Sequence, residues 1–248
     1  MMRRISGLLV LAAVTVAILA RPQAAHADVY VLESTTMTIS SGSHLAASDT
    51  ISIPKGSFIR AVLPSGKTQT IKGPYSGLVA DLDKGQPHND GVISWIRNIL
   101  ETGGSKEATP GATRGIRREP AVVNMAFSWS AVPVTADAVV CIARNGTVQL
   151  VRAPSLRAER VTIVDTLSGA RGEAQWEAGG ADAAWPANLT PRADTIYYLL
   201  IPDRPQRQLR FRILEQLPAD DDVLVVLQGE GCRSQFNAWV RERLASKR

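Results

Sequence analysis

Short runs of β-forming residues, broken by turn residues, cover most of this sequence. The first group lies between residues 29 and 81, at 29–32, 37–39, 51–53, 58–63 and 68–72. A second group begins near residue 121, at 122–129, 138–143, 147–152, 161–165, 173–176, 196–201 and 208–214. Runs this short and regular predict a mainly β protein with a small N-terminal β domain and a C-terminal β-sandwich-like domain.

Three segments break the β pattern with helical spacing. Val92, Ile93, Ile96, Ile99 and Leu100 share one face of a helix that Asn89 or Asp90 can cap and that Gly103 and Gly104 end. Near the C-terminus, Phe236, Trp239, Val240 and Leu244 share the face of a second helix. Residues 223–227 follow three aspartates and fit either a helix or a strand; we favour the helix.

These patterns divide the chain into four parts. Residues 1–27 form a signal segment, 28–84 a small β domain, 85–119 a helix and linker, and 120–248 a sandwich-like domain with a helical C-terminus. We expect a flexible linker at 105–118, because this stretch is rich in Gly, Pro, Thr and charge and has no periodicity.

Residues 1–27 have the three parts of a secretory signal. Arg3 and Arg4 precede an apolar run at 5–20, and Ala25-His26-Ala27 offers a cleavage site before Asp28. The run is shorter than the roughly 20 residues that span a bilayer, which disfavours the alternative of a retained anchor. We therefore expect an exported protein, in the periplasm or outside the cell, with no stable membrane insertion after cleavage.

The net charge changes when this segment is removed. Three of the five net positive charges of the chain belong to arginines of the signal, which has no acidic residue, so the mature chain carries +2. A nearly neutral chain lacks the basic excess typical of nucleic-acid binding. We therefore expect no nucleic-acid partner.

Cys141 and Cys232 are the only cysteines. In an oxidising compartment they predict one disulfide, which would attach the C-terminal helix to the β domain; two separate buried thiols are the alternative. The immunoglobulin arrangement does not fit, because Cys232 lies beyond the last predicted strand. Asn145-Gly146, between the runs 138–143 and 147–152, predicts a two-residue type I′ hairpin.

A resemblance to a known family arises within residues 29–81. The run ASDTISIPKGSFIRAVL, from Ala47 to Leu63, followed by Ser65-Gly66-Lys67-Thr68, resembles the FecR-like extracytoplasmic β domain, in which turns separate short strands. The resemblance implies a domain that senses or binds partners in the periplasm, often linked to an inner-membrane regulator of a sigma factor. Because this chain has no cytoplasmic anti-sigma portion, the resemblance implies a binding module rather than a signalling role.

Two loops resemble nucleotide or metal sites only in part. Ser65-Gly66-Lys67-Thr68 matches the end of a phosphate-binding loop, but Ala61 stands where that loop needs glycine and a strand pattern follows. The acidic loop from Asp81 departs from a calcium loop at positions 5, 6 and 12. We therefore expect no cofactor and no metal.

Catalytic residues are equally hard to find. Only His44 and His88 remain after signal cleavage, neither in a recognised catalytic setting, so the sequence favours a protein without enzymatic activity. A pair of carboxylates suited to glycoside hydrolysis stays open, because its spacing is set in space rather than in sequence.

Three residues are candidate ligand contacts. Trp185 lies in a loop rich in Gly and Ala, where an exposed indole would stack on a sugar, while Arg210 and Arg212 share one face of a strand and would meet an acidic partner. The alternatives are a core tryptophan and charged side chains that protect a strand edge. We expect a binding or scaffolding module of the bacterial envelope whose partner is an envelope protein or cell-wall glycan; the alternative is a carbohydrate- or peptidoglycan-directed binding protein or hydrolase.

Overall fold

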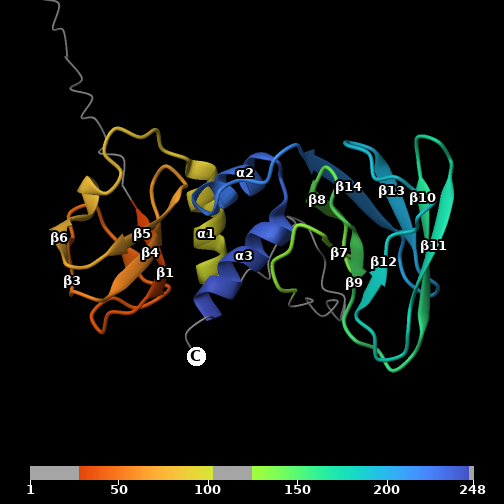
Figure 1. Ribbon diagram of the computed structural model, residues 1–248, viewed down its shortest axis with the longest axis horizontal. Coiled ribbons are helices and arrows are strands. Elements are labelled where there is room, and N and C mark those ends of the chain that lie inside the picture. Colours follow the sequence, from red (N-terminus) through yellow and green to blue (C-terminus); the bar gives the residue numbers. More distant parts are fainter. Residues whose placement is uncertain (1–27, 103–124, 246–248) are drawn as a thin grey trace, which may run out of the picture.

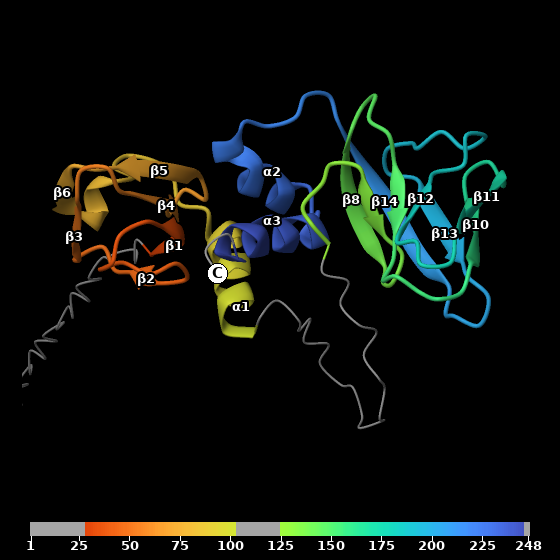
Figure 2. The ribbon, with the colours of Figure 1, turned by 60° about the horizontal axis from the view of Figure 1, so that its bottom comes forward.

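The computed structural model describes residues 28–102 and 125–245 of the 248-residue chain. It confirms the mainly β fold with helices after the first domain and at the C-terminal end. Two β domains lie at opposite ends of the molecule, and a layer of three helices separates them (Figures 1 and 2). The predicted signal at 1–27 and linker at 105–118 lie outside the described residues.

The N-terminal domain contains two antiparallel sheets. The larger has the order β2-β1-β4-β5, from His44–Leu45, Val29–Ser34, Phe58–Val62 and Thr68–Lys72; the smaller pairs β3 (Thr50–Ile53) with β6 (Tyr75–Leu78). A short 3₁₀ turn, Val79–Asp81, follows. The apolar side chains between the sheets form a separate core: Val29, Val31, Ile39, Ile51, Ile53, Ile59, Ala61, Leu63, Ile71 and Val79.

One predicted strand of this domain is wrong. Residues 37–39 form bends, because the Thr36 hydroxyl accepts a hydrogen bond from the Ile39 N–H at 3.1 Å and so offers the backbone a turn in place of a sheet partner. Met37 is fully exposed at this turn. Strand β6, which the sequence did not predict, pairs with β3.

The C-terminal domain is a sandwich of two sheets. The larger sheet has the order β11-β10-β13-β14-β8, with bounds Arg171–Trp176, Glu159–Asp165, Ile196–Leu200, Arg207–Leu214 and Ala138–Ala143. The smaller sheet has the order β12-β9-β7, with bounds Asp182–Ala184, Gln149–Val151 and Ala131–Pro133. Trp176, Tyr197 and Phe211 are the largest apolar side chains buried between them. The pairs β8–β14 and β7–β9 are parallel, and the others are antiparallel.

The predicted Asn145-Gly146 hairpin is wrong. The chain does turn there, since the Gly146 N–H donates to the Ala143 carbonyl at 2.9 Å. Strand β8 pairs with β14 in the larger sheet, however, whereas β9 pairs with β7 and β12 in the smaller one. The turn therefore carries the chain from one sheet to the other, and neither Asn145 nor Gly146 has the positive φ that a type I′ turn needs. Within 122–129, the described residues 125–129 form no strand, and β7 begins only at residue 131.

The helix layer consists of α1 (Asp90–Thr102), α2 (Val223–Gly229) and α3 (Arg233–Ala245). Of the two predicted caps, Asn89 or Asp90, Asn89 caps α1: its side-chain oxygen accepts the Val92 N–H at 3.1 Å. Residues 223–227 are helical, as favoured, but the preceding Asp220–Asp222 forms a 3₁₀ turn. None of the helices among the described residues is long and apolar enough to span a membrane.

One continuous core joins this layer to both β domains. It is formed by the buried faces of the three helices, by β1 and β4, and by β8, with these members: Tyr30, Leu32, Val62, Val92, Ile93, Ile96, Ile99, Cys141, Val223, Leu224, Leu227, Cys232, Phe236, Trp239 and Val240. The helices that the sequence groups with the C-terminal domain thus also pack against the N-terminal domain. Burial of these side chains opposes separation of the two β domains.

Ion pairs surround this core. Asp220 pairs with Arg60 at 3.0 Å and with Arg243 of α3 at 2.8 Å, and Asp222 pairs with Lys67 at 3.1 Å. Asp220 and Asp222, which precede α2, therefore reach the N-terminal domain, and Asp222 makes no side-chain capping bond. These pairs are partly exposed, so each contributes at most about 1 kcal/mol.

Covalent and polar contacts attach α3 to β8. Cys141 of β8 and Cys232, just before α3, form the predicted disulfide, with their Cα atoms 5.8 Å apart. One turn into α3, the buried Gln235 amide accepts the Cys141 N–H at 2.7 Å and donates to the Cys141 carbonyl at 2.8 Å and to the Ser128 carbonyl at 2.9 Å. The Gln235 side chain thereby satisfies backbone groups on the outer edge of β8, where the sheet ends.

Candidate binding surface

The outer face of the five-stranded sheet, turned away from the sandwich core, carries the strongest candidate surface. Alternation within β10, β13 and β14 buries residues such as Ile163, Leu199 and Leu209 and turns their neighbours outward. Cross-strand pairs then place Thr162 beside Leu200, Val164 beside Tyr198, and Ile196 beside Arg210. We call the set Arg160, Thr162, Val164, Ile196, Tyr198, Leu200 and Arg210 the outer strip.

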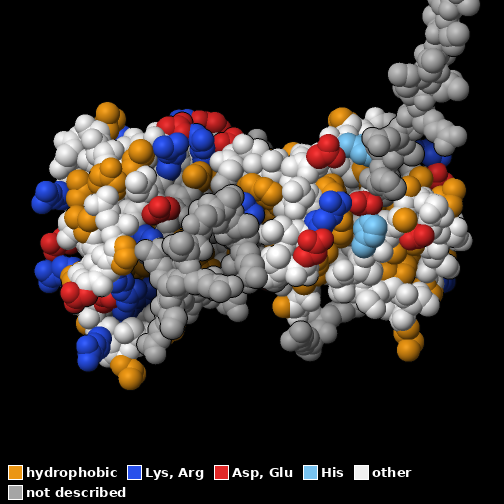
Figure 3. All heavy atoms as spheres, turned by 180° about the vertical axis from the view of Figure 1, so that it is seen from behind, with side chains coloured by type: hydrophobic (Ala, Val, Ile, Leu, Met, Phe, Trp, Pro, Cys, Tyr) orange, Lys and Arg blue, Asp and Glu red, His pale blue; other side chains and the backbone are white. Residues whose placement is uncertain are grey.

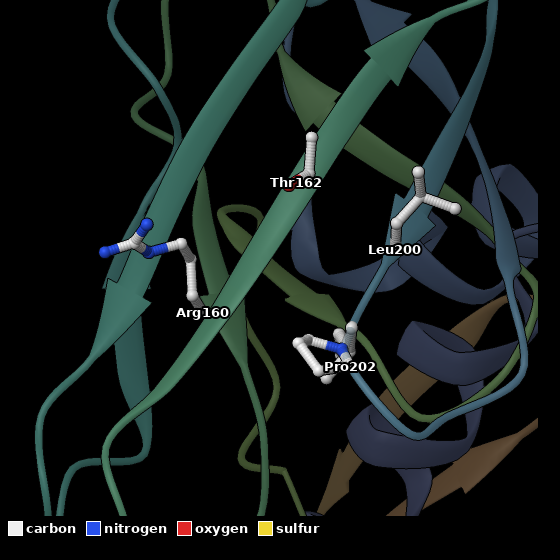
Figure 4. Close-up of a pocket in the computed structure, with 5 residues that line it drawn as sticks. Arg160, Thr162, Leu200 and Pro202 are labelled. Atoms are coloured by element: carbon white, nitrogen blue, oxygen red, sulfur yellow. The ribbon is translucent and has the colours of Figure 1, made fainter.

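A shallow hollow of about 310 Å³ lies at one end of the outer strip. Arg160, Thr162, Leu200, Ile201 and Pro202 line it. Figure 4 shows Arg160 and Thr162 on one strand and Leu200 and Pro202 on the neighbouring segment. The hollow is near the lower limit for a ligand pocket, and its apolar residues and single cation suit an apolar group beside a negative charge.

The two predicted arginines differ in their surroundings. Arg212 pairs with Asp194 and lies 3.7 Å from a carboxylate oxygen of Glu230 in the α2–α3 turn. Arg210 makes no ion pair or side-chain hydrogen bond with any residue that the structure describes. Arg210 is therefore the more available of the two for a ligand, although both lie on the same face of β14.

Trp185 is turned toward the sandwich core. It packs edge-on against Tyr197 at 5.4 Å and Phe211 at 5.2 Å between ring centroids, and its indole N–H donates to the Leu189 carbonyl at 2.7 Å. Its ring is only partly accessible, and it lies apart from the outer strip, because Tyr197 and Phe211 are on the inner face of the sheet. The structure therefore does not bring Trp185 together with Arg210 and Arg212.

Sequence reasoning missed Arg160, Thr162 and Leu200. The alternation of 161–165 and 196–201 is visible in the sequence and assigns these residues to outward positions. Their proximity depends on the antiparallel pairing of β10 with β13, which the sequence pattern does not give.

Two buried polar clusters stabilise the sandwich. Arg152, 2% exposed, donates to Glu159 at 2.8 Å and to the Arg157 carbonyl at 3.1 Å, and it lies over the Trp176 ring. Arg204 also pairs with Glu159, at 2.7 Å. The two terminal nitrogens of Arg152 thus connect Glu159 to the Arg157 carbonyl, while its buried Nε has no hydrogen-bond partner among the described residues.

The second cluster joins Asp165 to Tyr197 through Arg192. Burial alone would raise the pKa of Asp165, but hydrogen bonds from Ser168 and Leu167 and the nearby Arg192 guanidinium outweigh burial and lower that pKa. Burial raises the pKa of the Tyr197 hydroxyl, which donates to the Thr190 carbonyl and accepts the Arg192 N–H. Both groups face structural partners, and we assign them no catalytic role.

His44, one of the two histidines that remain after the predicted signal cleavage, lies in a cluster beside the start of β1. His44 contacts Asp28 at 2.9 Å, and Asp28 also pairs with Arg97 of α1 at 2.9 Å. Hydrogen bonding to Tyr30 and the Asp28 carboxylate raise the pKa of Arg97. The hydrogen bonds of the described residues include none between His44 and a serine or threonine hydroxyl.

The loop at Ser65–Thr68, which resembles a nucleotide site, and the acidic loop from Asp81, which resembles a metal site, are hydrogen-bonded to each other. Asp83 accepts hydrogen bonds from the Ser65 N–H at 2.7 Å and from its hydroxyl at 3.1 Å. Residues 64–67 form the β4–β5 turn, and Lys67 pairs with Asp222. Across residues 28–102 and 125–245, no three His, Cys, Asp or Glu side chains gather as metal ligands would.

Figure 3 shows acidic and basic side chains interspersed over one face of the molecule, without a large field of one sign. At the left of that view the C-terminal domain exposes hydrophobic side chains beside basic ones. Such a mixed surface is compatible with a protein partner.

Comparisons with known proteins identify no relative. No protein-family profile matches the sequence, no curated protein matches it, and no solved structure matches the fold.

Proposed function

We propose that the protein is an exported, non-enzymatic binding or scaffolding module of the bacterial envelope that acts on another envelope protein. The observation that carries this proposal is the continuous core around the three helices, here called the helix-layer core, to which both β domains contribute buried side chains. A single body that holds two β surfaces at fixed spacing suits a scaffold better than a catalyst, which needs a cleft with reactive groups.

Two further observations support export. The disulfide between Cys141 and Cys232 persists in oxidising compartments such as the periplasm. Cleavage after Ala27 would start the mature chain at Asp28, one residue before β1. Asp28 would remain in place through its contacts with His44 and Arg97.

We extend the FecR-like resemblance to the N-terminal domain as part of this proposal. Short strands in two small sheets, joined by turns at Gly56 and Gly66, match what the resemblance implies for a periplasmic β binding domain. The domain would act as one half of the scaffold, since its β1 and β4 also build the helix-layer core.

The test uses residues 28–248 with the disulfide formed, immobilised and exposed in parallel to an envelope extract of the source cells and to purified peptidoglycan. We expect one protein to be retained in nearly stoichiometric amount, and little peptidoglycan. Retention of peptidoglycan without any protein would overturn the proposal in favour of a glycan-directed protein. The intact mass of the exported form should equal that of a chain that begins at Asp28. A mass that includes residues 1–27 would contradict export by cleavage.

A further inference from the structure

We propose that the outer strip binds an extended segment of a partner protein that is apolar in its middle and carries a carboxylate near each end, with these carboxylates meeting Arg160 and Arg210. This inference rests on the proposed function, because it assumes that the partner is a protein. It adds the binding surface and the chemistry of the segment that the surface would recognise.

The middle of the outer strip is apolar and only partly covered. Val164, Ile196 and Tyr198 are half-buried, and Leu200 is 37% exposed. Helix α3 packs on the outer side of β8, at one edge of the sheet, and leaves β10 and β13 uncovered by any helix among the described residues (Figure 2). An apolar row on an open sheet face gains stability when a partner removes it from water.

The charges set the length of the partner segment. The β10–β13 ladder ends at the pair Thr162–Leu200, and continuing its register by two residues puts Arg160 opposite Pro202, which lines the same hollow. Arg210 pairs with Ile196. Two strand spacings and six residues along the strand then separate their Cα atoms by roughly 20 Å. A carboxylate at each end of about six extended residues would match this spacing.

Few acidic groups compete for these cations. Arg160 pairs with Glu173 at 3.4 Å, but both side chains are more than half exposed. Arg210, two strands away on β14, makes no ion pair with any residue that the structure describes. A partner carboxylate can therefore approach Arg210 without breaking an existing pair.

Three other occupants fit less well. A glycan usually needs an exposed aromatic ring, yet all five tryptophans are buried or half-buried. The segment 103–120 of this chain carries Lys106, Arg114, Arg117 and Arg118 against Glu107 and Glu119, so its charge repels the arginines of the strip. A second copy placed face to face by two-fold symmetry would bring the same arginines together.

The experiment titrates residues 28–248, isotope-labelled, with synthetic peptides and follows the amide and methyl signals by NMR. The probe has glutamate at both ends of a run of apolar residues and threonine; its control has glutamine at both ends. We expect shift changes centred on Val164, Ile196 and Leu200 with the first peptide, weaker binding of the second, and weaker binding at higher salt.

Three variants test the contacts. Arg210→Glu and Leu200→Asp change the strip at surface positions, and Lys55→Glu makes the same charge change on an exposed turn of the other domain. We expect Arg210→Glu to weaken binding roughly three- to tenfold and Lys55→Glu to leave it unchanged. Thermal melting establishes that each variant is folded.

Several outcomes would overturn the inference. These are equal binding of the two peptides, equal competition by polygalacturonate as an anionic glycan, self-association through the same signals, or shift changes elsewhere. The proposed function fails separately, when the envelope extract yields no protein. If the extract yields one protein that Arg210→Glu and Leu200→Asp both retain fully, the proposed function stands and this inference fails.

Discussion

Replacement of Gln235 by leucine should lower the free energy of unfolding of the whole protein, because the Gln235 amide is the hydrogen-bond partner of backbone groups on the outer edge of β8. The side chain is 0% exposed and makes three hydrogen bonds of 2.7, 2.8 and 2.9 Å with the backbone of Cys141 and Ser128. Leucine has a similar size but leaves the buried N–H and carbonyl of Cys141 without a partner, and each such group costs about 1–3 kcal/mol. We expect a loss of about 3–5 kcal/mol, a large fraction of the roughly 5–15 kcal/mol typical of a folded domain.

The assay is guanidinium unfolding of residues 28–248 at neutral pH with the disulfide intact. Asn237→Leu, a partly exposed amide two residues along the same helix, is the matched control and should change stability by less than about 0.5 kcal/mol. If Gln235→Leu lies within about 1 kcal/mol of the parent and unfolds like the control, the amide does not contribute what its hydrogen bonds suggest.

Gln235→Glu gives an independent check through pH. An ionised carboxylate at this position would face the carbonyls of Ser128 and Cys141, so folding should raise its pKa. A carboxyl with a raised pKa binds its proton more tightly in the native state, and stability then falls as pH rises above its unfolded pKa. Relative to the parent, this variant should recover stability as pH falls from about 7 toward about 4.

The remaining expectations concern the disulfide, two glycines and one aspartate. Replacing Cys141 and Cys232 by serine opens a link across 91 residues and should cost about 4–5 kcal/mol in guanidinium unfolding; a loss below about 1 kcal/mol would mean that the unfolded chain is already restricted there. Gly91→Ala should be nearly neutral in thermal melting, because the added Cβ meets only the flexible end of the Gln228 side chain on α2 and alanine favours helix. Gly66→Ala should destabilise the protein by about 1 kcal/mol or more, since φ is +84° and the added Cβ would lie 3.0 Å from a methyl carbon of Val92 in α1. Equal melting temperatures of the two variants would contradict this packing. Folding lowers the pKa of Asp165, so the parent should lose stability as pH falls below about 4, and Asp165→Asn should show a smaller loss in urea unfolding between about pH 5 and pH 2; parallel curves would refute the assignment.

Local pattern predicted the elements whose own residues decide their structure. β10 and β14 alternate buried and outward residues, β8 is a continuous run of apolar residues, and α1 follows helical spacing with Asn89 as its cap. The missed strands have weaker local signals. β6 alternates only between half-buried and exposed residues, and β12 is Asp-Ala-Ala, so the pairing with β3 and β9 rather than β propensity defines them.

The outer strip shows the same limit. Alternation along 208–214 assigns Arg210 and Arg212 to one face, but the ion pairs of Arg212 with Asp194 and Glu230 depend on where distant segments meet. The sequence treats Trp185 as an exposed aromatic because its loop is rich in small residues, whereas in the structure its ring packs on Tyr197 and Phe211. Which arginine is available to a ligand is thus a tertiary property.

The layer between the β domains explains why division of the chain by composition misses its organisation in space. Residues 223–245 are continuous in sequence with the sandwich, but the buried positions of α2 and α3 face α1 and β1 as well as β8. The disulfide and the Gln235 amide connect this layer to β8. Ion pairs of Arg60 and Lys67 connect the segment before α2 to the N-terminal domain. A change at either side should therefore alter the stability of both β domains together, since neither can separate from the layer without exposing the same core.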